Sequence, residues 1–91
     1  MMVDKKDLIE GDFYVMSSHK DFKGSSWLIR YKYEEMYLGG GKNFNRGPHE
    51  HDFEYYKKAT PQQENHIKAC IEAGRFISES EIILIDNYEI Y

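Results

Sequence analysis

The amino-acid sequence predicts an α+β fold: a small curled antiparallel sheet, or a partly open barrel, of three to five strands with one α-helix packed across it. Three observations support this prediction. Apolar and polar side chains alternate along residues 26–33, residues 59–76 contain every signal of one helix, and the chain has 91 residues. That length lies near the lower end of the sizes that bury a self-sufficient core, so we expect residues 1–91 to form a single domain.

The strand prediction rests on four short stretches. Residues 13–16 form an apolar run after a turn at residues 10–12. In residues 26–33 one set of side chains is expected to face the core: Trp27, Ile29, Tyr31 and Tyr33. Leu28, Arg30 and Lys32 fall between them, and this alternation predicts a strand with one buried face. Residues 36–38 continue that strand or open the next one, and residues 52–59 return to a strand-like composition.

Local signals place a helix at residues 61–74. Thr60 stands at the N-cap position, Pro61 at the first helical position, and Gln63 completes a capping box. Gly74 is expected to end the helix in the left-handed conformation. The hydrophobic anchor beyond it consists of Phe76 and Ile77. The apolar stripe of the helix holds Ile67, Cys70 and Ile71. A stripe this narrow is typical of a helix that lies on one sheet.

Three segments carry weaker patterns. We expect residues 1–7 to be loosely ordered. Residues 39–51 hold four of the seven glycines and one large apolar side chain, Phe44, which predicts a flexible exposed loop. Residues 81–91 are apolar and acidic, and they are expected either to complete the sheet as a C-terminal strand or to dock on a partner as a tail.

Composition argues against several classes of protein. Sixteen acidic side chains against twelve basic ones give a net charge of −4, which disfavours duplex nucleic acid as the main partner. The single cysteine excludes an internal disulfide. No apolar run approaches the roughly 18 residues that span a bilayer, and the first six residues lack the apolar core of a signal peptide. We therefore expect a cytoplasmic protein without a membrane partner.

The possible chemical sites are all weak. His49 and His51 would project to the same side of an extended chain, but no spacing supplies further metal ligands, so we expect no metal. The glycine-rich stretch lacks the Ser or Thr that follows the lysine of a phosphate-binding loop. Cys70 and His66 are four residues apart on the helix, yet Cys70 lies on its apolar stripe. We predict no enzyme and no cofactor.

Candidate binding residues fall in two groups. The loop and the strand before it offer Tyr37, Lys42, Phe44 and Arg46. The C-terminal segment offers Glu79, Glu81, Asp86, Tyr88 and Glu89, and contains no Lys or Arg after residue 76. The acidic segment could imitate the charge of nucleic acid in a basic groove of a partner, or add a strand to the edge of its sheet. The loop cations around Phe44 could instead contact single-stranded RNA.

Residues 57–77 resemble the closing segment of many short proteins from bacterial phages and prophages. The matching features are Ala59-Thr60-Pro61, Cys70-Ile71, Ala73-Gly74 and Phe76 as a bulky anchor. The upstream half carries no such resemblance. Small acidic phage proteins of this kind are often inhibitors of host defence machinery, including CRISPR effectors. The resemblance therefore implies a host protein as the partner.

These observations predict a non-catalytic binding protein of a phage or mobile element that inhibits a host nuclease-type, CRISPR-like defence effector by protein–protein contact. Two alternatives stay open: a small RNA-binding module that uses residues 39–51, and a structural or assembly accessory of a phage particle. The oligomeric state is not predicted.

Overall fold

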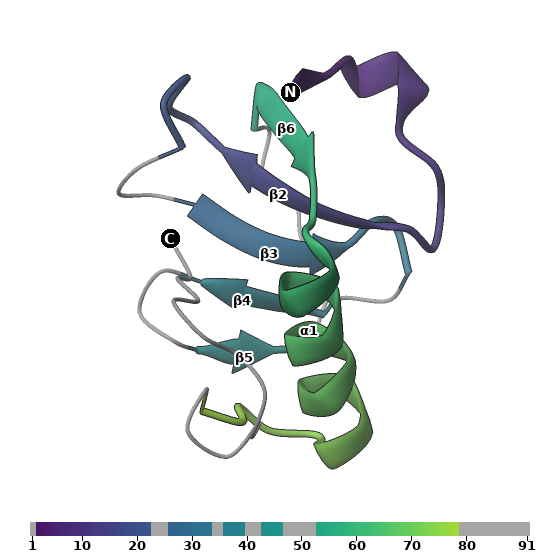
Figure 1. Ribbon diagram of the computed structural model, residues 1–91, viewed down its shortest axis with the longest axis vertical. Helices are drawn as coiled ribbons and strands as arrows, with labels where there is room; N and C mark the ends of the chain where they lie inside the picture. The colour runs from purple at the N-terminus through teal and green to yellow at the C-terminus, as the bar shows by residue number, and fades with distance from the viewer. Residues whose placement is uncertain (1, 23–25, 34–35, 40–42, 47–52, 79–91) are drawn as a thin grey trace.

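One antiparallel sheet of six strands and one α-helix make up the described part of the chain. The computed structural model describes residues 2–22, 26–33, 36–39, 43–46 and 53–78. The strand order is β1-β6-β2-β3-β4-β5, and the sheet is open (Figure 1). The α+β prediction is confirmed, although the sheet has one strand more than the upper limit of the prediction.

The sheet has more strands than predicted because a very short strand lies at each of its two edges. The strands are β1 (Met2–Val3), β2 (Phe13–Ser17), β3 (Ser26–Arg30), β4 (Tyr37–Gly39), β5 (Phe44–Asn45) and β6 (Tyr55–Lys58). A 3-10 turn, η1 (Lys5–Asp7), follows β1, and the helix is α1 (Pro61–Ala73). Two-residue strands are too short to show an alternating pattern, so β1 and β5 fell within segments predicted to be loose. Residues 81–91 lie outside the described residues.

The start and the end of α1 match the sequence signals. The Thr60 hydroxyl accepts a hydrogen bond from the Gln63 N–H at 3.1 Å, and the Gln63 side chain accepts one from the Thr60 N–H at 2.9 Å. Gly74 has φ 70°, and its N–H donates to the Cys70 carbonyl at 2.8 Å. These contacts satisfy backbone groups that helix ends otherwise leave unpaired. Among the described residues, no helix has the length and apolar content to cross a membrane.

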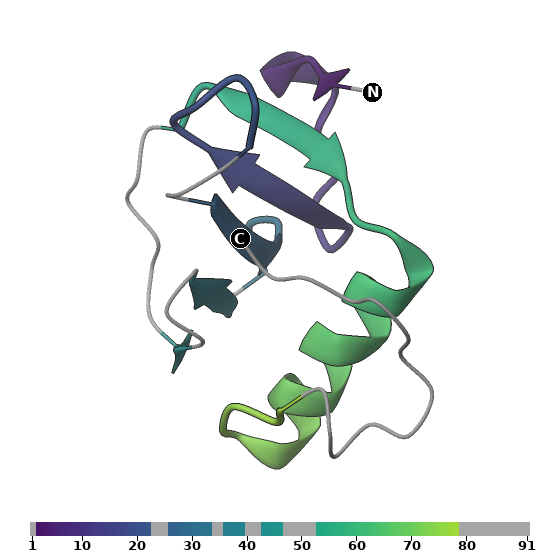
Figure 2. The ribbon, with the colours of Figure 1, turned by 60° about the vertical axis from the view of Figure 1, so that its left-hand side comes forward.

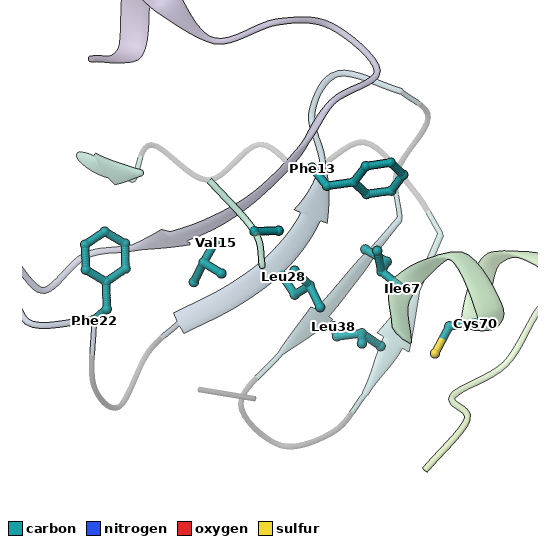
Figure 3. Packing of buried hydrophobic residues seen from close by; sticks show 8 residues of the cluster. Phe13, Val15, Phe22, Leu28, Leu38, Ile67 and Cys70 are labelled. Atoms are coloured by element: carbon teal, nitrogen blue, oxygen red, sulfur yellow. The ribbon is translucent and has the colours of Figure 1, made fainter. Parts of the chain in front are cut away.

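The main core lies between the sheet and α1. Figure 2 shows the helix against one side of the sheet, and Figure 3 shows the side chains that meet there. This helix-side core consists of Phe13, Val15, Phe22, Leu28, Leu38, Ala59, Ile67 and Cys70. Phe76 and Ile77 pack against it, so the predicted anchor beyond the helix is also present.

The opposite face of the sheet carries a second, aromatic layer. Its buried members are Tyr14, Met16, Ile29, Phe53 and Tyr56, and its partly buried members are Val3, Leu8, Trp27, Tyr31 and Tyr37. Leu28 and Ile29 are therefore both buried although they point to opposite faces. The prediction that β3 has one buried face was wrong. Both sides of the sheet bury apolar surface, because the aromatic rings pack on one another where no α-helix covers them in the described chain.

Candidate functional site

Two turns are fastened together at one end of the sheet. Residues 9–12 precede β2, and residues 31–33 follow β3. Figure 1 shows both segments at the same end of these two strands. The Gly11 N–H donates to the Tyr31 carbonyl at 2.9 Å, and the Tyr31 N–H donates to the Asp12 carbonyl at 2.8 Å. Gly11 has φ 87°, which a glycine adopts without strain. The two turns thus form one hydrogen-bonded backbone unit.

Exposed apolar side chains project from this unit. Ile9 is 62% exposed and Tyr33 is 49% exposed. Of the large apolar side chains in the described chain, only Met2, on the edge strand β1, is comparably exposed at 47%. We use the name turn surface for four residues of these turns and of the end of β3: Ile9, Arg30, Lys32 and Tyr33.

Arg30 is the half-buried member of the turn surface. Its guanidinium carbon lies 3.7 Å from the centroid of the Tyr33 ring, which is a close cation–π contact. One terminal nitrogen donates to the sulfur of the buried Met36 at 3.6 Å. The Nε atom is buried and has no hydrogen-bond acceptor among the described residues. The contacts with Tyr33 and Met36 thus orient the guanidinium at the end of β3.

The neighbouring carboxylate is already neutralised. Asp12 forms an ion pair with Lys58 and accepts a hydrogen bond from the Phe13 N–H at 3.2 Å. The hydrogen bond from Lys58 lowers the pKa of Asp12 below its usual range, against a smaller opposing effect of burial. Within the described residues, Arg30 and Lys32 form no ion pair. The same pair of turns also carries Glu10, whose side chain is exposed.

The predicted binding residues of the loop do not form one surface. Tyr37 pairs with Asn45, and Leu38 pairs with Phe44. Because directly paired residues share a face and successive residues alternate, Tyr37 and Phe44 lie on opposite faces. Tyr37 packs in the aromatic layer with its ring centroid 4.8 Å from that of Trp27.

The other predicted residues divide between buried, exposed and undescribed positions. Phe44 packs partly against the helix-side core, so its ring is not the exposed loop aromatic that we expected. Arg46 is exposed. The remaining candidates lie outside the described residues: Lys42, His49, His51, Glu79, Glu81, Asp86, Tyr88 and Glu89.

His66 and Cys70 hold the chain that follows the helix. Both side chains are fully buried. The Cys70 sulfur accepts a hydrogen bond from the Ile77 N–H at 3.3 Å, and His66 Nε2 lies 2.5 Å from the Ile77 carbonyl oxygen. Because a carbonyl oxygen is only an acceptor, Nε2 carries the proton. We call this arrangement the Ile77 clasp. Cys70 and His66, which were considered above as a possible chemical site, therefore have a role in packing.

Sequence reasoning missed the turn surface. It placed Tyr31 and Tyr33 in a strand with buried side chains, whereas β3 ends at Arg30 and Lys32 takes a left-handed φ of 53°. The charged run at residues 30–35 was the signal that the strand ends there.

Searches for related proteins gave no further information. A scan against protein-family models, a search of curated proteins and a search of solved structures each found no match to this chain. In the part of the chain that the structure describes, no group of three or more His, Cys, Asp or Glu side chains could hold a metal ion.

Proposed function

We propose that the protein is a non-catalytic binding protein that acts by contact with another protein, and that the turn surface is its contact region. The observation that carries this proposal is the exposure of Ile9 and Tyr33 on turns that backbone hydrogen bonds hold in place. Aromatic side chains and arginine are enriched in protein interfaces. A surface that is ordered before binding loses little conformational entropy when a partner docks.

The proposed partner is a host nuclease-type defence effector, and the proposed effect is inhibition. The resemblance of residues 57–77 to phage proteins supports this choice. Inhibition by blockade requires a stable scaffold and a surface, and it requires no reacting group. The Ile77 clasp fits this proposal, because it uses Cys70 and His66 to hold backbone inside the core.

The acidic C-terminal residues give the proposal a second element. Glu79, Glu81, Asp86 and Glu89 account for the whole net charge of −4, because the remaining chain holds twelve acidic and twelve basic side chains. A segment of that composition is suited to a basic groove such as one that binds nucleic acid. We propose it as a second contact with the same effector.

A cell-based interference assay tests the proposed function. Expression of the protein should restore infection by a phage that the CRISPR system of the host otherwise blocks. The double variant Ile9→Ser/Tyr33→Ser should lose most of this effect, because it removes the exposed apolar contact. Met2→Ser is the matched control, since it removes a side chain of similar exposure from the edge strand. Equal activity of all three proteins would refute the assignment of the turn surface.

Affinity capture separates protein partners from RNA. The tagged protein should retain its effector partner after the lysate is treated with ribonuclease and deoxyribonuclease. Loss of every partner on RNA digestion would instead support the RNA-binding alternative. Phe44 packs partly against the helix-side core, so less of its ring is available for the base stacking on which that alternative relied.

A further inference from the structure

We propose that the segment after the Ile77 clasp, residues 79–91, docks on the helix-side core of its own chain, where the apolar run at residues 82–85 covers Val15 and Phe22. The inference goes beyond the proposed function, because it assigns a binding site within the scaffold whatever the effector is.

One end of the helix-side core lies away from α1. Figure 3 shows Phe22 and Val15 at the end of the cluster opposite Ile67 and Cys70, which are the helix residues of that core. In Figure 1, α1 crosses the sheet near the start of β2 and the end of β3. Phe22 belongs to the turn that joins these strands at their other ends. The helix therefore covers only part of this face of the sheet.

The two side chains beyond the helix are nevertheless buried: Phe22 is 5% exposed and Val15 is 2% exposed. Side chains stand roughly perpendicular to a sheet, so neighbours on the same face flank them without covering their outer ends. The flanking residues are Lys57, which pairs with Val15 and lies with Nζ 4.7 Å from the centroid of the Phe22 ring, and Tyr55. The other described residues of the turn, 18–21, are polar and exposed. The cover over this end of the core therefore comes from another segment.

The backbone at Phe22 also depends on burial of its ring. Phe22 has a left-handed φ of 60°, which is unfavourable for a bulky side chain. Its N–H donates to the His19 carbonyl at 3.0 Å, and its carbonyl accepts from the Ser26 hydroxyl at 2.8 Å. A strained conformation persists only where its surroundings over-determine it. Packing over the ring is thus part of what maintains this turn.

Composition identifies the covering segment. Four short internal stretches lie outside the described residues, and none contains a large apolar side chain: 23–25, 34–35, 40–42 and 47–52. Met1 is a single side chain beside the edge strand β1. Residues 79–91, in contrast, hold Ile or Leu at four consecutive positions, 82–85. A run that is apolar at every position is typical of a segment buried on both sides.

The Ile77 clasp starts this segment on the correct face of the sheet. Ile77 is held by the clasp and packs against the helix-side core. An extended chain from residue 78 to residue 85 spans roughly 23–25 Å. The intermediate dimension of the molecule is 26 Å. The segment is therefore long enough to run from the clasp across the sheet to Phe22.

Docking has a consequence for the acidic side chains. Glu81 and Asp86 bracket the apolar run, so they are held at its two ends when the run docks. A contact that is ordered before binding loses less conformational entropy when a partner arrives. This consequence rests on the proposed second contact with the effector, whereas the docking itself does not.

Nuclear Overhauser spectroscopy on the intact protein tests the docking directly. The full chain is prepared with protonated Ile, Leu and Val methyl groups and protonated Phe rings in a deuterated background. We expect cross-peaks from methyl groups of residues 82–85 to the Val15 methyl groups and the Phe22 ring. Cross-peaks only to Val3 on the opposite face, cross-peaks only to Phe44 on the edge strand β5, or no cross-peaks to any of these residues would overturn the inference.

A mixed sample distinguishes docking within one chain from docking on a second copy. Chains with protonated methyl groups are mixed with chains that have protonated Phe rings, and the mixture is unfolded and refolded together. We expect the cross-peaks to the Phe22 ring to disappear. Their persistence between the two kinds of chain would show exchange of the segment between copies, and would reject docking on the same chain.

A double-mutant cycle measures the energetic link. Adjacent residues of an extended chain project to opposite sides, so Ile83→Ala/Leu84→Ala removes a core contact whichever side docks. Combined with Val15→Ala, this pair should show a coupling of about fivefold or more in the equilibrium constant of unfolding in urea. Val3→Ala is the matched control, because it makes the same substitution in the aromatic layer on the opposite face, and should show no coupling.

Equal coupling with Val15→Ala and Val3→Ala, or none with either, would reject the docking site. If a variant fails to fold, the spectra of the wild type decide the question alone. The proposed function fails separately: a wild type that restores infection but shows no cross-peaks to Val15 or Phe22 would keep the inhibitory function and reject the docking.

Discussion

The contact between Gly39 and Trp27 gives the sharpest prediction about stability. The two residues are register partners on β4 and β3. A Cβ atom on Gly39 would lie 2.4, 2.8 and 2.9 Å from three carbons of the Trp27 ring. Carbon atoms normally approach to about 3.5 Å, so the ring would have to move by about 1 Å. Gly39 does not have a positive φ, and the conflict in Gly39→Ala is therefore steric.

The size of the effect follows from what fixes the ring. Trp27 packs edge-on against Tyr37, with 4.8 Å between ring centroids, and at a tilt against Phe53, with 6.4 Å between centroids, so displacement of the ring disturbs both contacts. Overpacking of this kind costs roughly 1–3 kcal/mol. The lower entropy of the unfolded chain offsets about 0.4–1 kcal/mol when glycine becomes alanine. We expect Gly39→Ala to reduce the free energy of unfolding by about 1–2 kcal/mol, equivalent to roughly 4–15 °C in Tm for a domain of this size.

A double-mutant cycle measures the cause directly. Urea unfolding is followed by far-UV circular dichroism for the wild type, Gly39→Ala, Trp27→Val and the double variant. Since Trp27 is the only tryptophan, its fluorescence also reports on the displaced ring. In the Trp27→Val background the alanine should cost little, which gives a coupling energy of about 1–2 kcal/mol.

Equal destabilisation by Gly39→Ala in both backgrounds would show that the Trp27 ring does not cover Gly39. Gly74→Ala serves as the control, because Gly74 has φ 70° and open space around the added Cβ. Its cost, about 1–2 kcal/mol for a left-handed alanine, should be the same with and without Trp27.

Three further predictions concern local contacts. Thr60→Ala should lower the free energy of unfolding in urea by about 1 kcal/mol, because it removes one half of the capping box; no change would place the helix start elsewhere. Asp12→Asn should lower Tm at pH 7, where the carboxylate is paired with Lys58. Since the pKa of Asp12 is lowered on folding, this stabilisation exists above the usual pKa and is lost as pH falls through the folded one; a difference in Tm that persists at pH 2 would contradict this. Cys70→Ala should cost about 2 kcal/mol, since it opens a cavity and leaves the Ile77 N–H without its acceptor, whereas rapid modification of native Cys70 by a thiol reagent would show that the clasp is open.

The helix was predictable because its signals are local. Thr60, Pro61 and Gly74 determine where α1 begins and ends, and each acts within one turn of itself. Burial of His66 was not predictable in this way. It depends on Ile77, eleven residues further along the chain, whose carbonyl the imidazole contacts.

The antiparallel arrangement of the sheet was predictable from the sequence, but the number of its strands was not. β2 and the apolar part of β3 show clear patterns, but β1 exists because Met2 and Val3 find β6 more than fifty residues later. The expected grouping of Tyr37 with Phe44 on one surface was wrong for a related reason. Tyr37 and Phe44 were grouped by closeness in sequence, whereas the pairing of β4 with β5 sends them to opposite faces. The pairing of strands decided both outcomes, across more than fifty residues for β1 and β6 and across a short connection for β4 and β5.

The position of β6 has a consequence for how the chain is made. This strand lies between β1 and β2, yet it is synthesised after the other five strands of the described chain. Until residues 55–58 leave the ribosome, β2 presents an unpaired edge and β1 has no neighbour. Open edges of this kind invite pairing with other chains. A fragment that stops before residue 53 should therefore aggregate, and ribosome-bound intermediates of this protein should depend on chaperones until β6 has been synthesised.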